Sequence, residues 1–255
     1  MPLRFTAADL PQAAAQFREW QAAAAAVVAF TGAGISTESG IPDFRSPGGV
    51  WAKNRTIYFR EFQMSADARF EYWRQKAEAH RDFVVAKPNV THQTLAQWER
   101  AGQLRGVITQ NIDGLHQLAG SHEVLELHGT ARFVGCLSCS WREPADAWVD
   151  IFVREQRVPN CPQCGGHLKH ATVSFGQSLP EDVLETAIEW TSNCDLFLAL
   201  GSSLVVEPAE SLPRLARQHG AKLVIVNRDP TPLDNLARLV VNAPLGEFFA
   251  ALAQS

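Results

Sequence analysis

The chain has 255 residues, 46% hydrophobic and 20% charged, which is enough for one large core with a small satellite. Its net charge of −4 offers no basic surface for nucleic acid, and no apolar run approaches the about 18 residues of a membrane span. Neither a signal peptide nor a secreted disulfide framework is visible, since four of the five cysteines form two close pairs. We therefore expect a cytoplasmic protein with no nucleic-acid or membrane partner.

The predicted elements alternate between helices and short buried strands. An Ala-rich helix is expected over residues 7–25. Short apolar runs bounded by polar or turn residues follow at 27–30, 107–108, 124–127, 196–200, 223–226 and 239–241. Continuous apolar strands alternating with helices are typical of a parallel sheet covered on both faces. The predicted fold class is therefore α/β, with a Rossmann-like parallel sheet.

Two stretches interrupt this alternation. Residues 44–88 are rich in aromatic and charged side chains, with helical spacing after Ser65. Residues 131–171 hold the paired cysteines and are expected to form a loop and a short hairpin. We interpret both as insertions, one helical and one a zinc ribbon, into a single domain over 1–255. Together they are expected to form a smaller lobe.

The cysteines form the pairs Cys136-x-x-Cys139 and Cys161-x-x-Cys164. Two such knuckles bring four thiolates to one tetrahedral Zn²⁺, and a site closed by four cysteines is structural. The alternatives are a redox dithiol or unlinked buried thiols. Cys194, outside the pairs, is expected to be a core thiol.

A glycine turn follows the first strand, at Gly32-Ala33-Gly34. Glycines allow a tight turn and let backbone N–H groups approach a pyrophosphate. Thr37 occupies the place of a third glycine, and no acidic residue closes a strand about twenty residues on, so a hydride-transfer enzyme is disfavoured. By itself this pattern is also compatible with an ordinary turn.

Polar residues follow several other strands, where open α/β sheets bind ligands. His128 follows the strand at 124–127, and its near-neutral pKa suits a general base, although a lone histidine is more often structural. Gln110, Asn111 and Asp113 follow the strand at 107–108, where the alternative is a turn and helix cap. The segment Gly201-Ser202-Ser203 and Asn227 follow two later strands, and an ordinary strand–turn remains the alternative.

The wider context is more specific. Residues 32–46, GAGISTESGIPDFRS, closely resemble the cofactor-binding signature of the sirtuin (Sir2) family. Further blocks resemble the family in its order: TQNIDGLH at 109–116, LHG at 127–129, the paired cysteines, FGQSLP at 175–180, GSSL at 201–204 and VN at 226–227. The chain is thereby identified as a sirtuin of bacterial type.

The resemblance implies an NAD-dependent protein lysine deacylase that yields nicotinamide, O-acyl-ADP-ribose and free lysine. The implied catalytic residues are His128, as base, and Asn111. The implied NAD-binding residues are Gly32, Ala33, Gly34, Ile35, Asp43, Phe44, Arg45, Gln110, Asn111, Ile112, Asp113, Gly201, Ser202, Ser203, Asn227 and Asp229. The acyl-lysine peptide is expected to add as a strand along Val173, Phe175, Gly176 and Val206. Gln177 departs from the family's usual Glu. The resemblance places the structural zinc on Cys136, Cys139, Cys161 and Cys164.

Alternatives remain open at this point. A mono-ADP-ribosyltransferase or an NAD glycohydrolase on the same scaffold differs only in what captures the ribosyl carbon. A non-catalytic zinc-ribbon binding module is a different class.

The acyl group that the chain prefers is predicted from residues 70–74. Phe70 and Trp73 share a helical face, while Tyr72 and Arg74 do not. This pattern predicts an apolar acyl pocket and a preference for neutral acyl chains.

Overall fold

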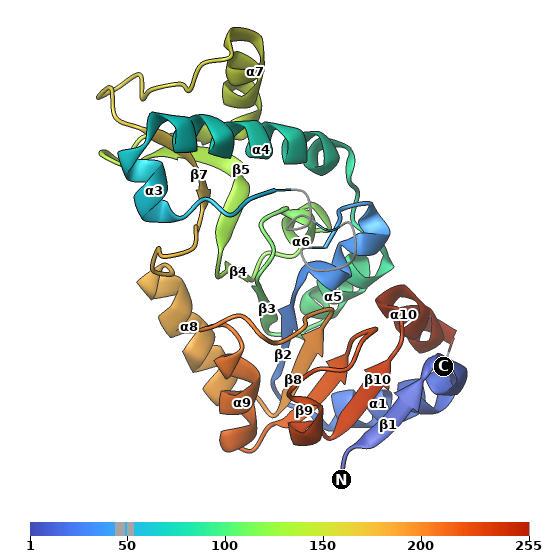
Figure 1. Cartoon of the computed structure of the whole chain (residues 1–255). Helices are drawn as coiled ribbons and strands as arrows, with labels where there is room; N and C mark the ends of the chain where they lie inside the picture. The colour runs from blue at the N-terminus through green and yellow to red at the C-terminus, as the bar shows by residue number, and fades with distance from the viewer. Residues whose placement is uncertain (44–48, 50–53, 255) are drawn as a thin grey trace.

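The structure is a computed structural model that describes residues 1–43, 49 and 54–254. Within this part of the chain, seven strands form one sheet in which every neighbouring pair is parallel. In spatial order they are β1 (Leu3–Thr6), β10 (Leu239–Asn242), β9 (Lys222–Val226), β8 (Leu196–Leu200), β2 (Val27–Thr31), β3 (Gly106–Thr109) and β4 (Val124–Glu126). The predicted parallel α/β sheet is confirmed (Figure 1).

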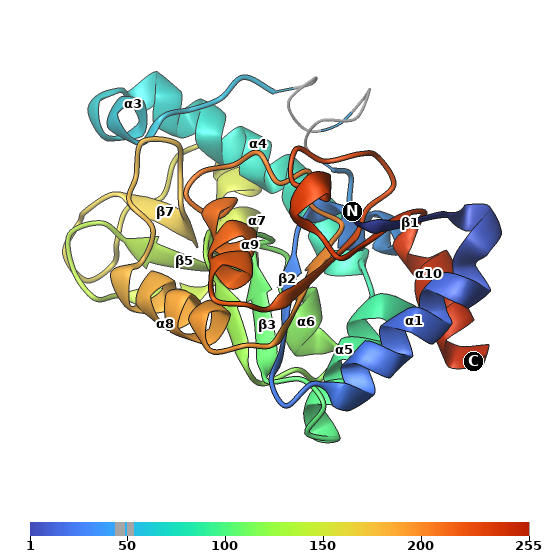
Figure 2. The ribbon, with the colours of Figure 1, turned by 90° about the horizontal axis from the view of Figure 1, so that it is seen from below.

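Helices cover both faces of this sheet (Figure 2). One face packs against α1 (Leu10–Ala23), α5 (Val90–Arg100) and α10 (Leu245–Gln254), and the other against α8 (Glu181–Ser192) and α9 (Ser211–Gln218). Alternate side chains of each central strand point to opposite faces, so every position of β2 and β8 is buried. This two-sided burial explains why the strands are continuous apolar runs.

The smaller lobe lies beyond the carboxyl end of the sheet, above it in Figure 1. Its elements are α3 (Phe59–Met64), α4 (Ala66–Val85), β5 (Gly129–Cys136), β6 (Arg142–Pro144), α7 (Ala145–Glu155) and β7 (Leu168–Thr172). Strands β6, β5 and β7 form an antiparallel sheet in that order. Trp73, Phe62, Phe152 and Leu168 bury a core of their own. The lobe therefore has separate packing from the main sheet.

Strand β1 and helix α7 were not expected from the sequence. Strand β1 pairs with β10 at the sheet edge, yet its residues are mostly exposed, so no apolar run marked it. Helix α7 lies within the stretch expected to be loop and hairpin. Its Ala145, Val149 and Phe152 recur at helical spacing and are buried against the small lobe. No described helix is long and apolar enough to cross a membrane.

Candidate active site

A cavity of about 1340 Å³ lies between the carboxyl ends of the central strands and the smaller lobe. Most of the predicted site residues line it. They are Gly32, Ala33, Gly34, Asp43, Gln110, Asn111, Ile112, His128, Val173, Phe175, Gly176, Gly201, Ser202, Ser203, Val206, Asn227 and Asp229. Ile35 and Asp113 do not line the cavity, because the Ile35 side chain packs into the core and Asp113 is buried behind Ser36. Phe44 and Arg45 lie outside the described residues.

The glycine turn after β2 crosses the turn after β8 at backbone contact. Gly34 N–H donates to the Gly201 carbonyl at 2.8 Å, and Gly32 N–H donates to Leu200 at 3.1 Å. A Cβ on Gly34 would lie 2.7 Å from the Gly201 oxygen, and one on Gly32 would lie 2.8 Å from Ser202 Cβ. Gly201 itself has φ +62°, in the left-handed region that favours glycine. Glycine is thus required here by chain crossing, which leaves bare backbone on the cavity wall.

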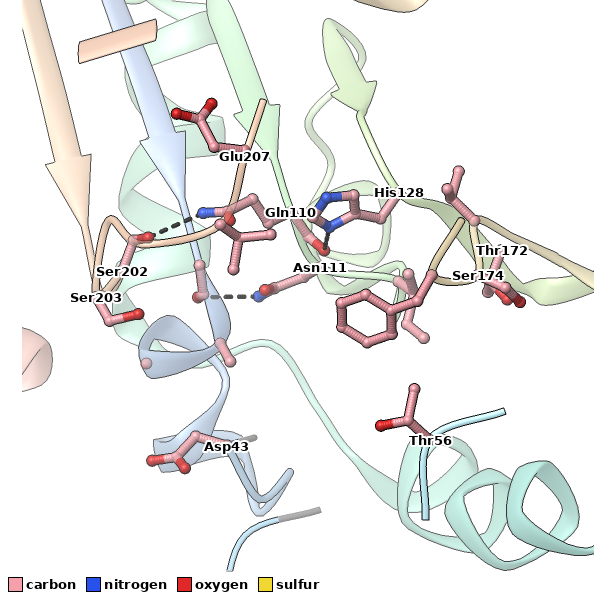
Figure 3. A pocket seen from close by; sticks show the side chains of 18 of the residues that line it. Asp43, Thr56, Gln110, Asn111, His128, Thr172, Ser174, Ser202, Ser203 and Glu207 are labelled. Carbon is pink, nitrogen blue, oxygen red and sulfur yellow. Dashed lines mark hydrogen bonds between the residues drawn. The ribbon is translucent and has the colours of Figure 1, made fainter. Parts of the chain in front are cut away.

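His128 follows β4 and lies half-buried at the cavity wall. Its Nδ1 is 2.9 Å from the Gln110 carbonyl oxygen, which can only accept, so Nδ1 carries the proton (Figure 3). The neutral ring therefore keeps a lone pair on Nε2. Burial lowers the pKa of His128, and the bond to Gln110 partly offsets that shift. The ring is suited to accept a proton at neutral pH.

A buried hydrogen-bond network holds Asn111 against the glycine turn. Its side-chain Nδ2 donates to the Gly32 carbonyl and to Ser36 Oγ, each at 3.1 Å. Ser36 in turn donates to Asp113 Oδ2 at 2.7 Å, while Asp113 Oδ1 accepts from Leu115 N–H. Burial raises the pKa of Asp113. Asp113 thus fixes Ser36 and Asn111 and does not itself face the cavity.

The opposite part of the cavity is lined by hydroxyl and amide groups from β8 and β9. Gln110 Nε2 donates to Ser202 Oγ at 2.9 Å, which joins the ends of β3 and β8 (Figure 3). Asn227 Nδ2 donates to the Asp229 carbonyl at 2.7 Å, and Ser203 lines the same wall. Such groups can bind ribose and phosphate oxygens.

An exposed chain segment borders the cavity on the side of the small lobe. Val173 N–H donates to the His128 carbonyl at 2.8 Å, so this segment starts beside the imidazole. Phe175 follows with an exposed ring, and Gly176 has φ +81°. Gln177 Oε1 accepts from Ser174 N–H at 3.2 Å, a local contact that needs no charge at this position.

A model of the Sir2 family matches residues 32–208. The NAD-dependent protein deacetylase of Rhodopseudomonas palustris is 48% identical over 244 residues, which cover 94% of this chain and 96% of that protein. The chain belongs to the Sir2 family. A solved structure of Sir2 with a p53 peptide and NAD⁺ has a TM-score of 0.87 at 38% identity, and the match covers 94% of this chain and 96% of that one. Another, with a deacetylated p53 peptide and 3′-O-acetyl ADP ribose, has a TM-score of 0.88 at 38% identity over 94% and 97% of the two chains.

The small-lobe end of the cavity is not lined by the two aromatic residues that were expected to form the acyl pocket. Neither Phe70 nor Trp73 lines it, so the expected apolar pocket was wrong: both rings pack on Phe152, at 5.4 and 5.8 Å. Tyr72 and Lys76, one helical turn apart on α4, line the cavity in their place. A cation therefore stands where an apolar wall was expected.

Two contacts define this cation and its surroundings. Tyr72 Oη is 3.2 Å from Thr172 Oγ1, which places the phenol at the end of β7. Lys76 Nζ lies 5.5 Å from the centre of the Tyr72 ring. Burial lowers the pKa of Lys76 to about 8. Glu71 forms hydrogen bonds with Arg74 and Gln75.

The four paired cysteines gather in the small lobe, away from the cavity. Their sulfur atoms all lie within 4.8 Å of one another, with 3.5 Å between Cys136 and Cys164 and 3.7 Å between Cys139 and Cys161. Four thiolates on one tetrahedral Zn²⁺ at about 2.3 Å stand about 3.8 Å apart. The cluster thus fits a structural zinc ion, and none of its members lines the cavity.

Ser36 and Lys76 were not among the predicted site residues, and Tyr72 was considered only for its spacing from Arg74. Ser36 stands inside the glycine motif, but its partner is Asp113, 77 residues later, and only the folded chain brings them together. For Lys76 a signal was available, because it follows Tyr72 by four residues on a predicted helix.

Proposed function

We propose that the chain is an NAD-dependent protein lysine deacylase, a deacetylase in its simplest form. The observation that carries this function is one continuous cavity with three unlike walls. Bare glycine backbone and hydroxyl groups line the part suited to a dinucleotide, His128 presents a base, and an exposed strand end borders the same space. The Sir2 relatives named for NAD-dependent deacetylation support the assignment.

In this mechanism the chain's residues orient NAD and move one proton. NAD supplies the ribosyl group that takes up the acyl group, and one water molecule is consumed as the acyl–lysine bond breaks, so the products are nicotinamide, O-acyl-ADP-ribose and free lysine. Nε2 of His128 accepts a proton from a ribose hydroxyl, while Nδ1 stays bonded to Gln110. Asn111, fixed through Ser36, is proposed to bind the nicotinamide end of NAD, and Phe44 and Arg45 are proposed to contribute to NAD binding.

The acylated lysine of a protein is proposed to enter along Val173, Phe175 and Gly176, facing Val206. An added strand contacts mainly backbone groups, so side-chain preference is expected to be weak. The zinc ion holds the small lobe together and takes no part in the chemistry. We further propose that the protein acts in the cytoplasm and does not bind nucleic acid, since its net charge is −4.

Mass spectrometry with an acetyl-lysine peptide and NAD tests this function. We expect deacetylated peptide and O-acetyl-ADP-ribose in equal amounts, with turnover reduced about 10²- to 10⁴-fold by His128→Ala. ADP-ribose attached to protein, or free ADP-ribose without deacetylation, would instead support the transferase or glycohydrolase. No nicotinamide release from either variant would indicate a binding module.

A further inference from the structure

Two buried imidazoles lie close behind the cavity wall, one from α5 and one from α6 (Leu115–Leu118). The ring centres of His92 and His116 are 4.9 Å apart, and both side chains are almost fully buried. Burial lowers the pKa of His92 to about 4 and also lowers that of His116, so both rings are neutral at pH 7. The mechanism above uses neither ring.

His116 connects to the segment that follows β3. Its Nε2 is 3.0 Å from Thr31 Oγ1, and Thr31 donates to Thr109 Oγ1 at 2.8 Å. Thr109 Oγ1 also accepts from Asn111 N–H at 3.0 Å. Because the Thr31 hydroxyl proton goes to Thr109, Nε2 of His116 must donate to Thr31. Nδ1 of His116 is then an acceptor, and it has no partner among the described residues.

His92 connects to the segment that follows β2. Asn89 Nδ2 donates to the Ile35 carbonyl at 2.7 Å and to Ser39 Oγ at 3.0 Å, which fixes Asn89 Oδ1 as an acceptor. His92 Nδ1 lies 3.0 Å from that oxygen and 3.4 Å from the Asn89 backbone nitrogen. The shorter contact is the stronger one and requires a proton on Nδ1, so we assign the proton there. Nε2 of His92 is then also an acceptor, again without a described partner.

One branch of hydrogen bonds runs from His116 through Thr31 and Thr109 to Asn111, and the other runs from His92 through Asn89 to Ile35, which precedes Ser36. Asn111 Nδ2 donates to Ser36 Oγ and so joins the two branches on the cavity side. Together they form a circuit of hydrogen bonds that lacks one link, between the two histidines. The two nitrogens without a described partner, His92 Nε2 and His116 Nδ1, belong to rings whose centres are 4.9 Å apart, and we place the open link between them. Two acceptors cannot bond to each other, but one water molecule has two hydrogens to donate. Buried unpaired nitrogens would each cost about 1–3 kcal/mol, and buried waters commonly satisfy such groups.

We propose that His92 and His116 are positioning residues, joined by one buried water that donates to both rings, and that they hold the glycine turn against the segment bearing Asn111. This inference rests on the proposed function in one respect, namely that NAD lies between these two segments. The circuit then keeps the nicotinamide end of the cavity in its binding shape before NAD arrives.

Two substitutions remove the proposed water bridge and keep the contacts of the two histidines with Asn89 and Thr31. His92→Asn keeps an amide near the position of Nδ1, beside Asn89, and removes Nε2. His116→Gln keeps an amide near Nε2, beside Thr31, and removes Nδ1. We expect each to raise the Kd of NAD, measured by titration calorimetry, about 5- to 30-fold, the worth of one bridging interaction. KM for the acetyl-lysine peptide should change less than about twofold.

The double variant and a control make the test decisive. Both substitutions lose the same water. The double variant should therefore bind NAD no more weakly than whichever single variant has the higher Kd for NAD. Leu95→Val, a buried change on α5 outside the circuit, should lower the Tm and leave the Kd of NAD unchanged. Unchanged NAD affinity in both folded single variants, or additive losses in the double variant, would overturn the proposal.

The Kd of NAD can be measured whether or not the protein deacetylates a peptide. A wild-type chain that binds NAD without deacetylating peptide would refute the proposed function while the circuit is still tested. A wild-type chain that fails to bind NAD would overturn both.

Discussion

At the residue scale, the state of His128 follows from its surroundings. The Gln110 carbonyl fixes the tautomer, and burial lowers the pKa below the ordinary 6.5. A protonated ring cannot act as base, so activity is present above the lowered pKa and lost below it. We expect kcat/KM for an acetyl-lysine peptide to stay level from pH 8 to 6.5 and to fall only below pH 6.5. An acid limb with its midpoint above pH 7 would contradict this.

Among the residues of the candidate site, those that follow strands could be predicted from the sequence, since the carboxyl ends of parallel strands meet at one edge. This reasoning places Gln110, Asn111 and His128 together. It cannot order them by depth, and Asp113 turned out to be buried behind Ser36. Contacts between distant segments of the chain leave no local pattern.

At the element scale, the crossing of the turns after β2 and β8 explains the glycines better than cofactor approach alone. Gly201→Ala should destabilise the fold in two ways, through φ +62° and because its Cβ would lie 2.5 Å from Ile35 N. Gly220 is the matched control, with φ +94° and nothing within 4 Å of an added Cβ. Gly220→Ala should lower the free energy of unfolding, measured with urea, by about 1–2 kcal/mol. Gly201→Ala should lower it by clearly more. Equal losses would show that the crossing is not crowded.

Helix α4 gives a second element-scale prediction, because it carries Lys76 to the cavity. An ammonium group there favours an acyl chain that ends in a carboxylate, relative to acetyl, as long as the lysine is charged. With a pKa of about 8, that charge is present below pH 8 and lost above it. The ratio of kcat/KM for succinyl-lysine to that for acetyl-lysine should therefore fall as pH rises through 8.

Lys76→Met tests the same point at constant pH. It should lower that ratio roughly 3- to 10-fold at pH 7, a typical range for one partly exposed charge contact, and remove its dependence on pH. Arg74→Met serves as the control, since Arg74 bonds to Glu71 and does not line the cavity. A ratio that is equal in wild type and Lys76→Met would exclude contact between Lys76 and the acyl group.

The elements themselves were predictable to the extent that burial leaves a pattern. The central strands are apolar throughout because both faces are covered, and they were found from the sequence. Strand β1 is held by backbone pairing with β10 and is mostly exposed, so its side chains give no signal. Helix α7 did leave a helical pattern, at Ala145, Val149 and Phe152, but the neighbouring cysteine pairs favoured a loop interpretation.

At the scale of the whole molecule, stability is divided between a large sheet core and a small lobe with its own core. The small-lobe core includes Cys161, which is buried together with Val134 and Leu168, while Cys164 is exposed. A core this limited gains much of its stability from a closed four-thiolate site, because metal binding free energy adds to folding. The small lobe also supplies one wall of the cavity, so loss of metal should affect both stability and activity.

We expect one zinc ion per chain by elemental analysis, and its loss in Cys161→Ser. If the free energy of unfolding of Cys161→Ser falls by about 3 kcal/mol, the Tm should fall by roughly 6–12 °C. Cys194→Ser is the matched control: this thiol is buried near Thr191, outside the cluster, and its substitution should leave the zinc content unchanged. NAD binding should persist longer than peptide turnover as a chelator removes the metal, because the glycine crossing belongs to the sheet core and the peptide edge joins the small lobe. A zinc-free protein with unchanged Tm and turnover would refute the assignment of the four cysteines.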